Sequence, residues 1–313
     1  MIEMANRRGL AEKEGCMEIR EVGVIGCGLM GSGIAQVVAT AGHSTVVVEV
    51  NQELCDRGMA NIEKQLDRQA QKGTLKPEER VAIRSRLRAT TDRAQLANCD
   101  LVMEAVIENL EEKKNLWQSL EPILPKHAIL ASNTSSLSIT EMMRYTSRPE
   151  RFVGIHFMNP VPVMKLVEVI RTVETDPKVF EAAIEFVSKL GKTPVRTSDR
   201  PGFIVNRLLI PYLLDAIRAL EQGTGSITDL DRSMQLGCGH PMGPFTLADF
   251  IGLDTTYYIA NILFEEFREP RFAPPGLLKR LVLAGWLGRK TGKGFYDYAD
   301  PSAPRAQEHI CQI

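Results

Sequence analysis

The chain has 313 residues, with 38 Lys and Arg against 39 Asp and Glu, so its formal net charge is −1. A length of this size predicts about two domains. The 44% hydrophobic and 25% charged composition is typical of a globular protein and excludes wholesale disorder. Balanced charge argues against a nucleic-acid-binding protein, which needs a surplus of basic residues to neutralise phosphates.

The cysteines and the N-terminus both argue for a reducing, cytoplasmic environment. No pair of cysteines forms a CxxC motif, and none lies near a histidine at metal-ligand spacing, so we expect free thiols and no metal site. Residues 1–16 mix acidic with basic side chains and lack an apolar core, so we expect a loosely ordered extension rather than a targeting peptide. The cysteines are Cys16, Cys27, Cys55, Cys99, Cys238 and Cys311.

An uncharged stretch from Val22 to Val48 is long enough to span a bilayer. It contains six glycines and is interrupted by polar residues, which favours a buried strand, turn, helix and strand instead. No other segment approaches the length of a membrane span, so we expect no membrane association.

Short apolar runs alternate with amphipathic stretches as far as residue 200. Continuous β-branched runs are typical of parallel strands covered on both faces, so this region is predicted to be a doubly wound α/β domain over residues 17–200. The predicted strands are 22–25, 45–48, 101–106, 128–131, 152–157, 166–170 and 193–197. The predicted helices are 30–41, 51–72, 77–87, 110–124, a short helix capped by Ser138, and 177–190.

The pattern changes at Arg200-Pro201-Gly202. Only helical periodicity follows, which predicts an all-helical domain over residues 201–313. Its apolar faces exceed what one small bundle buries, so we expect a homodimer formed through this domain. The predicted helices are 203–221, 229–235, 245–251, 255–267 and 276–284.

A glycine-rich turn joins the first predicted strand to the first helix, and an acid ends the second strand about 20 residues on. Gly26 allows a tight turn, Gly28 lets the backbone approach a pyrophosphate, and Gly31 lets helix and strand pack closely. Glu49 is suited to bind an adenosine ribose and to repel a 2′-phosphate, which favours NAD over NADP. The complete turn is Gly26-Cys27-Gly28-Leu29-Met30-Gly31.

A second group of polar residues interrupts later apolar runs. His156 ends one run before a proline-rich turn, and Glu168 lies in the next, where a carboxylate is costly unless it is paired. If the two runs are neighbours, Glu168 can hold one imidazole nitrogen while the other faces a cofactor, as a general base requires. The alternative is a core histidine satisfied by a structural acid.

Five sequence blocks carry a family resemblance: GLMGSGIAQ at 28–36, NTSSL at 133–137, HFMNPVPVMKLVEV at 156–169, PGFIVNR at 201–207 and PMGPF at 241–245. Together they resemble the L-3-hydroxyacyl-CoA dehydrogenase family, over residues 17 to about 298. This resemblance implies a Rossmann-like domain followed by a helical one, and NAD-dependent oxidation of a (3S)-3-hydroxyacyl-CoA in fatty-acid metabolism and β-oxidation. A short-chain, 3-hydroxybutyryl-CoA substrate is our expectation for a compact enzyme.

The resemblance also implies roles for individual residues. His156 takes the hydroxyl proton and Glu168 orients it. Ser135 and Asn206 hydrogen-bond the reacting oxygen, and Lys72 meets coenzyme A phosphates. The residues implied to lie against NAD, besides the glycine turn and Glu49, are Glu108, Lys113, Ser135, Asn159 and Lys290.

Two other functions remain open from the sequence. One is a dehydrogenase of a free sugar acid or 3-hydroxy acid, which would share the glycine turn and a histidine. The other is a crystallin-like protein that binds NAD without turnover. The presence of Ser135, His156, Glu168 and Asn206 together argues against the second.

Overall fold

The computed structural model describes residues 17–312. The predicted extension, residues 1–16, lies outside this range. The chain divides after Arg200 into two compact units, which are described separately below. In the part of the chain that is described, no helix combines the length and the apolar character needed to cross a bilayer.

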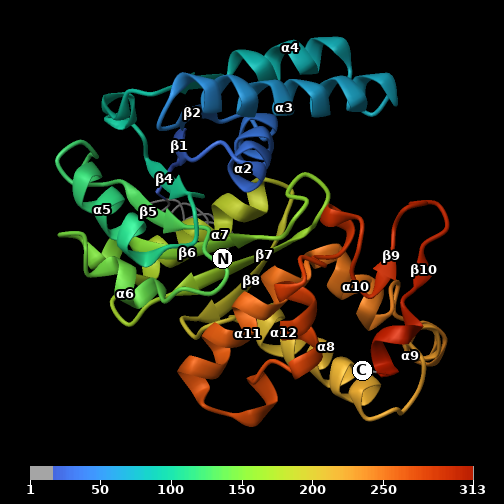
Figure 1. The fold of residues 1–313 in the computed structure, drawn as a ribbon. Coiled ribbons are helices and arrows are strands. Elements are labelled where there is room, and N and C mark those ends of the chain that lie inside the picture. Colours follow the sequence, from blue (N-terminus) through green and yellow to red (C-terminus); the bar gives the residue numbers. More distant parts are fainter. Residues whose placement is uncertain (1–16, 313) are drawn as a thin grey trace, which may run out of the picture. The chain divides into compact units, whose positions relative to one another are not determined.

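An eight-stranded sheet forms the centre of the first unit (Figure 1). Its strand order is β3-β2-β1-β4-β5-β6-β7-β8, and every neighbouring pair is parallel except β6 with β7. The strands are β1 (Glu21–Ile25), β2 (Ser44–Val48), β3 (Leu87–Thr90), β4 (Leu101–Glu104), β5 (Ile129–Ser132), β6 (Phe152–Phe157), β7 (Leu166–Arg171) and β8 (Thr193–Ser198).

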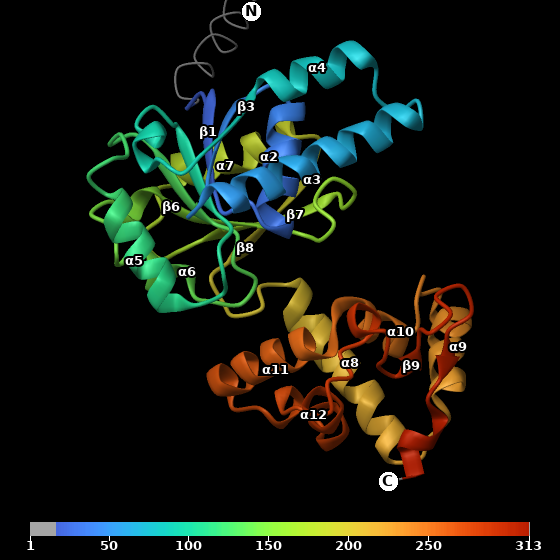
Figure 2. The same cartoon turned by 45° about the horizontal axis from the view of Figure 1, so that its top comes forward.

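Four helices of this unit, α3, α5, α6 and α7, begin at a residue whose side chain caps the helix. Asn51 accepts a hydrogen bond from the backbone of Leu54 at the start of α3, and Ser138 does the same for α6. Figures 1 and 2 show α3 and α4 side by side. The helices of this unit are α2 (Leu29–Thr40), α3 (Gln52–Gln71), α4 (Pro77–Ser85), α5 (Leu110–Leu120), α6 (Ile139–Met143) and α7 (Pro177–Lys189).

The predicted α/β alternation is confirmed, with one strand missed. The helix predicted to end near Leu87 ends at Ser85, and Leu87–Thr90 then forms the edge strand β3 beside β2. Only Leu87 of its four residues is buried. A short, mostly polar edge strand lacks the apolar run by which buried strands are recognised.

The second unit is helical, as predicted, with a small hairpin added after the last helix. A core of aliphatic and aromatic side chains fills it, including Leu214, Phe245 and Leu278. The hairpin consists of β9 (Tyr296–Asp297) and β10 (Arg305–Ala306), which are too short to produce a sequence pattern. The helices are α8 (Val205–Glu221), α9 (Ile227–Cys238), α10 (Pro244–Ile251), α11 (Leu253–Phe267) and α12 (Gly276–Leu283).

Two buried aspartates join the helices of this unit to its hairpin. Asp231 accepts hydrogen bonds from the backbone of Phe245 and from the Tyr296 hydroxyl, while Asp249 accepts them from Phe295, Tyr296 and Tyr298. Burial raises the pKa of Asp249 to about 6. The three donors therefore only partly offset the loss of water around this carboxylate.

Candidate active site

The residues predicted to act in the first unit gather at one edge of its sheet. Gly26 follows β1, Glu49 follows β2, Asn133 follows β5, and His156 is the last residue but one of β6. These strands are mutually parallel, so their carboxyl ends meet at the same edge. In open α/β sheets ligands bind at this edge. Sequence positions from 26 to 156 thus meet at one edge of the sheet.

The glycine turn is built by close backbone contacts. Gly26 has φ +91°, a conformation that favours glycine, and its backbone N–H donates to Val48 at 2.9 Å. A Cβ at Gly31 would lie 1.8 Å from the carbonyl oxygen of Gly26, so only glycine permits the helix to start this close to the strand. Gly26 and Gly31 therefore adopt the turn and the close packing that the glycine motif predicts.

The start of α2 fits the pyrophosphate of a dinucleotide. Gly28 is the N-cap residue and has no side chain to satisfy the helix N–H groups, and the first turn carries no acidic residue. Among the described residues, no atom outside its chain neighbours would lie within 4 Å of a Cβ added at Gly28. Glu49 accepts from the backbone N–H of Cys27 at 2.5 Å, which places its carboxylate beside the turn. The cradle is open where a phosphate would enter.

Cys27, between the glycines, faces into the protein. It is 3% exposed, and a Cβ at Gly58 of α3 would lie 2.1 Å from its Sγ. Burial raises the pKa of the Cys27 thiol to about 12, so the thiol stays protonated and unreactive. The absence of a side chain at Gly58 lets α3 pack closely against Cys27 on the glycine turn.

His156 and Glu168 face each other across the antiparallel β6–β7 pair. The Nδ1 atom of His156 lies 2.8 Å from Oε2 of Glu168. Their exposed fractions are 7% and 0%, so this is a buried imidazole–carboxylate pair. The two sequence runs are therefore neighbours, and the carboxylate fixes the orientation of the ring and holds a proton on Nδ1.

The hydroxyl-rich segment after β5 is held from two sides. Oδ1 of Asn133 accepts from the backbone N–H of Phe157 at 2.9 Å, next to His156. On the other side Glu108 uses Oε1 to accept from the Thr134 hydroxyl, the Ser135 N–H and the Ser136 hydroxyl. Ser135, half-buried, thus lies on a segment whose position is fixed by neighbouring strands.

A buried lysine continues this network beneath the segment. Lys113 is 1% exposed, and its Nζ lies 2.7 Å from Oε1 of Glu104 and 3.2 Å from Oε2 of Glu108. Burial alone would lower the pKa of Lys113, but the two carboxylates outweigh it and raise this pKa. Burial likewise acts to raise the pKa of Glu108, but the charge of Lys113 and the hydrogen bonds hold it below its usual value.

A groove with a volume of about 460 Å³ runs between α2, α3 and the 159–163 turn. Asn159 lies on this turn, and Lys72 follows α3 at the other side of the groove. Lys64 and Arg68 on α3 add positive charge to the same wall. The groove therefore combines apolar turn residues with a basic helix face, a combination suited to a ligand with phosphates and an apolar tail.

Two predicted site residues belong to the second unit. Asn206 lies in the first turn of α8 and is half-buried. Lys290 lies in a short 3-10 helix, where its Nζ is 2.6 Å from the Asp254 carboxylate.

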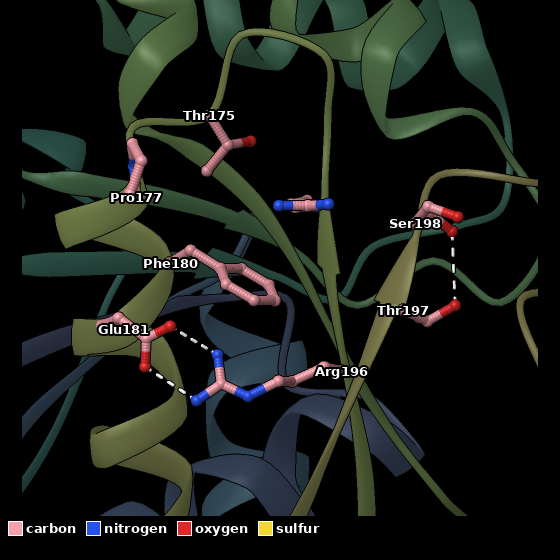
Figure 3. A pocket seen from close by; sticks show the side chains of 8 residues that line it. Thr175, Pro177, Phe180, Glu181, Arg196, Thr197 and Ser198 are labelled. Carbon is pink, nitrogen blue, oxygen red and sulfur yellow. Dashed lines mark hydrogen bonds and ion pairs between the residues drawn. The ribbon is translucent and has the colours of Figure 1, made fainter.

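Another hollow, of about 410 Å³, lies between α7 and the edge strand β8 and contains none of the predicted site residues. Figure 3 shows the Glu181–Arg196 ion pair at its side, next to the Phe180 ring. Within residues 17–312, no group of three His, Cys, Asp or Glu is placed to hold a metal ion.

Sequence reasoning missed Glu104 and Asn133. Glu104 is an acid inside the apolar run predicted as strand 101–106, which is the same signal that points to Glu168. Asn133 appears in the sequence analysis only within the NTSSL block, because its hydrogen bond with Phe157 joins residues 24 positions apart.

Comparison with known proteins gives consistent matches across both units. The description "3-hydroxyacyl-CoA dehydrogenase, NAD binding domain" fits residues 21–200, and that of the C-terminal domain of the same enzyme fits residues 202–298. A 3-hydroxybutyryl-CoA dehydrogenase of Bradyrhizobium diazoefficiens is 49% identical over 280 residues, covering 90% of this chain and 96% of the relative. The mitochondrial hydroxyacyl-coenzyme A dehydrogenase of Homo sapiens is 46% identical over 287 residues, covering 90% and 91%. The crystal structure of (S)-3-hydroxybutyryl-CoA dehydrogenase from Ralstonia eutropha matches with a TM-score of 0.88 at 41% identity, covering 90% of this chain and 100% of that chain.

The open cradle at Gly28 generates a prediction about cofactor binding. We expect Gly28→Ala to weaken NADH binding by about tenfold or more, because its methyl group would stand where the pyrophosphate approaches. The backbone φ of −68° accepts alanine, so the thermal unfolding midpoint should change little. Fluorescence titration with NADH and a thermal melt measure the two effects.

Gly237→Ala in α9 is the matched control, since a Cβ there also meets no atom within 4 Å in the described structure. It should leave NADH affinity unchanged. Equal NADH affinity of Gly28→Ala and wild type would show that this backbone position does not face the cofactor.

Proposed function

Because the chain belongs to the 3-hydroxyacyl-CoA dehydrogenase family, and is therefore an NAD-dependent oxidoreductase, we propose that it oxidises a short-chain (3S)-3-hydroxyacyl-CoA to the 3-oxoacyl-CoA. The observation that carries this proposal is the buried His156–Glu168 pair at the carboxyl edge of the sheet. A base with its own orienting carboxylate, at the same sheet edge as a dinucleotide cradle, is suited to oxidise a hydroxyl group.

The proposed role of His156 follows from which nitrogen Glu168 engages. Since Nδ1 lies 2.8 Å from the carboxylate, the proton exchange with substrate falls to Nε2. Nε2 accepts the proton of the 3-hydroxyl group as the C3–H bond breaks, and Glu168 stabilises the imidazolium that forms. In the reduction of a 3-oxoacyl-CoA the same nitrogen returns the proton to oxygen.

NAD, when bound, supplies the acceptor for the hydride that leaves C3. We assign the glycine turn and Glu49 to its pyrophosphate and adenosine ribose. Ser135 and Asn206 are our proposed hydrogen-bond donors to the reacting oxygen. The further residues that we propose lie against the cofactor are Glu108, Lys113, Ser135, Asn159 and Lys290.

Coenzyme A recognition is proposed to use the basic wall of the groove beside α3. Arg68 and Lys72 line it and are exposed, so their charges can meet phosphate groups. The apolar Val161 to Val163 side of the same groove would accept the less polar part of the ligand.

We also propose that the protein is a cytoplasmic homodimer that associates through its helical unit. This unit leaves large apolar side chains exposed, among them Leu208 at 68%, Leu236 at 80% and Leu283 at 76%. Apolar groups at such exposure favour burial against another surface.

The function is tested by NADH oxidation with acetoacetyl-CoA, which wild type should reduce far faster than free acetoacetate. We expect His156→Gln to lower kcat by about 10²- to 10⁴-fold, the usual contribution of a general acid–base, with NADH affinity retained. Glu168→Gln should lower kcat more than it raises KM. His127→Gln, a histidine whose side chain is 64% exposed, is the matched control and should leave kcat unchanged.

Several outcomes would contradict this function. Faster turnover of the free acid would indicate a hydroxy-acid dehydrogenase, and NADH binding without any turnover would indicate a crystallin-like protein. Unchanged kcat in His156→Gln would remove the proposed base.

The assignment of the groove to coenzyme A predicts that Lys72→Met raises KM for acetoacetyl-CoA about three- to tenfold, with kcat unchanged, because an exposed charge pair with phosphate is weak. The same variant should show the wild-type KM for acetoacetyl-pantetheine, which lacks the nucleotide. Lys76→Met, four residues further on and outside the groove residues, is the control. An equal effect on both substrates would remove Lys72 from phosphate binding.

The proposed dimer predicts a molecular mass of twice 34.8 kDa in solution, measured by light scattering during size-exclusion chromatography. Leu208→Asp, Leu236→Asp and Leu283→Asp then locate the interface, because a buried aspartate opposes association while an exposed one does not. A mass of 34.8 kDa for wild type at micromolar concentration would overturn the dimer.

A further inference from the structure

We propose that Glu104 is a positioning residue that, through Lys113 and Glu108, sets the segment Thr134–Ser136 for cofactor binding, a role that rests on the proposed function. Glu104 ends β4 and has no exposed surface. It does not face the groove, so its effect must pass through other side chains.

The first step is the contact between Glu104 and its neighbours. Its Oε1 and Oε2 lie 2.7 and 2.8 Å from Nζ of Lys113, and the Ser132 hydroxyl also donates to Oε1. Ser132 is opposite Glu104 in the β4–β5 register. Glu104 therefore ties the ends of two adjacent strands to a lysine in α5.

The second step is that the two oxygens of the Glu108 carboxylate have different partners. Its Oε2 lies 3.2 Å from Lys113, while Oε1 accepts from the Thr134 hydroxyl, the Ser135 N–H at 3.2 Å and the Ser136 hydroxyl at 3.1 Å. The Lys113 ammonium holds Oε2, and this orients Oε1 to accept the hydrogen bonds of the Thr134–Ser136 segment.

The third step is the position of the charge. Lys113 sits closer to Glu104 than to Glu108, by 2.7 against 3.2 Å. If Glu104 lost its charge, Glu108 would be the remaining carboxylate beside the buried ammonium in the described structure. The ammonium would be drawn toward it, because Coulomb attraction is strong where water is excluded. Glu108 would then turn toward Lys113, and its bonds to the Thr134–Ser136 segment would lengthen.

The burial of Glu104 and Lys113, beside a partly exposed Glu108, also argues for a role beyond stability. Replacing a buried ion pair by neutral groups of similar volume is often neutral or stabilising, so such a network adds little to the stability of the fold. This network ends on the segment that carries Ser135, not deeper in the core. The charges of this network therefore serve to hold the orientation of the Thr134–Ser136 segment.

The test compares Glu104→Gln with Glu111→Gln. Glu111 forms a 2.9 Å ion pair with Lys114, the residue after Lys113 in the same helix. Unlike the Glu104–Lys113 pair, this pair is on the surface. We expect Glu104→Gln to weaken NADH binding by about 10- to 100-fold and to lower kcat, with KM for acetoacetyl-CoA within about twofold of wild type. Glu111→Gln should match wild type in all three.

A double variant, Glu104→Gln with Lys113→Met, separates positioning from stability. It removes both charges of the pair, so the thermal midpoint should recover relative to Glu104→Gln. We expect NADH affinity to stay at least about tenfold below wild type, because Glu108 then lacks the cation that holds its Oε2. This variant also carries the test if Glu104→Gln fails to fold.

Two results would overturn the inference: NADH affinity of Glu104→Gln equal to that of Glu111→Gln, or recovery of NADH affinity together with the thermal midpoint in the double variant. Both leave the proposed function intact, provided that wild type binds NADH and reduces acetoacetyl-CoA. A wild type that does neither would overturn the proposed function itself.

Discussion

The register between β6 and β7 is the constraint on which the site depends. Antiparallel pairing places His156 opposite Glu168, with side chains on the same face of the sheet. A slip of one residue would turn either side chain to the opposite face and leave a buried carboxylate without its partner. The flanking pairs, Ile155 with Val169 and Phe157 with Val167, are buried and apolar, so the same slip would also disrupt the core. Core packing therefore enforces the geometry of the site.

Asn133 connects this strand pair to the segment that carries Ser135. Its side-chain oxygen accepts a hydrogen bond from the backbone N–H of Phe157, one residue after His156, so the start of the segment is held against the strand that carries His156. The rest of the segment is held by Glu108. The Asn133 and Glu108 contacts therefore fix the position of Ser135 relative to the imidazole of His156. A reaction at a single carbon needs its participating groups to be held in place in this way.

Local sequence patterns predicted most of the fold because buried parallel strands are continuous apolar runs and the helices have amphipathic spacing, several with a capping side chain. They failed for β3, whose four residues include only one buried side chain, and for the hairpin β9–β10. The glycine turn was predictable for the same local reason, since Gly26, Gly28 and Gly31 act within six residues of one another. The contacts of Glu104 and Asn133 were not predictable, because their partners Lys113, Ser132 and Phe157 become neighbours only when the strands are ordered.

The pairing of each buried charge shows how the unit tolerates polar groups at the end of its sheet. Glu168 is matched by an imidazole, and Glu104 by an ammonium and a hydroxyl, so neither carboxylate is left without a donor in the core. The two arrangements differ in their chemistry. An imidazole has two ring nitrogens and can pass a proton, whereas Lys113 has its ammonium between two carboxylates, which raise its pKa and keep it charged. One pair is therefore suited to move a proton, and the other to hold a fixed charge that keeps its neighbours in place.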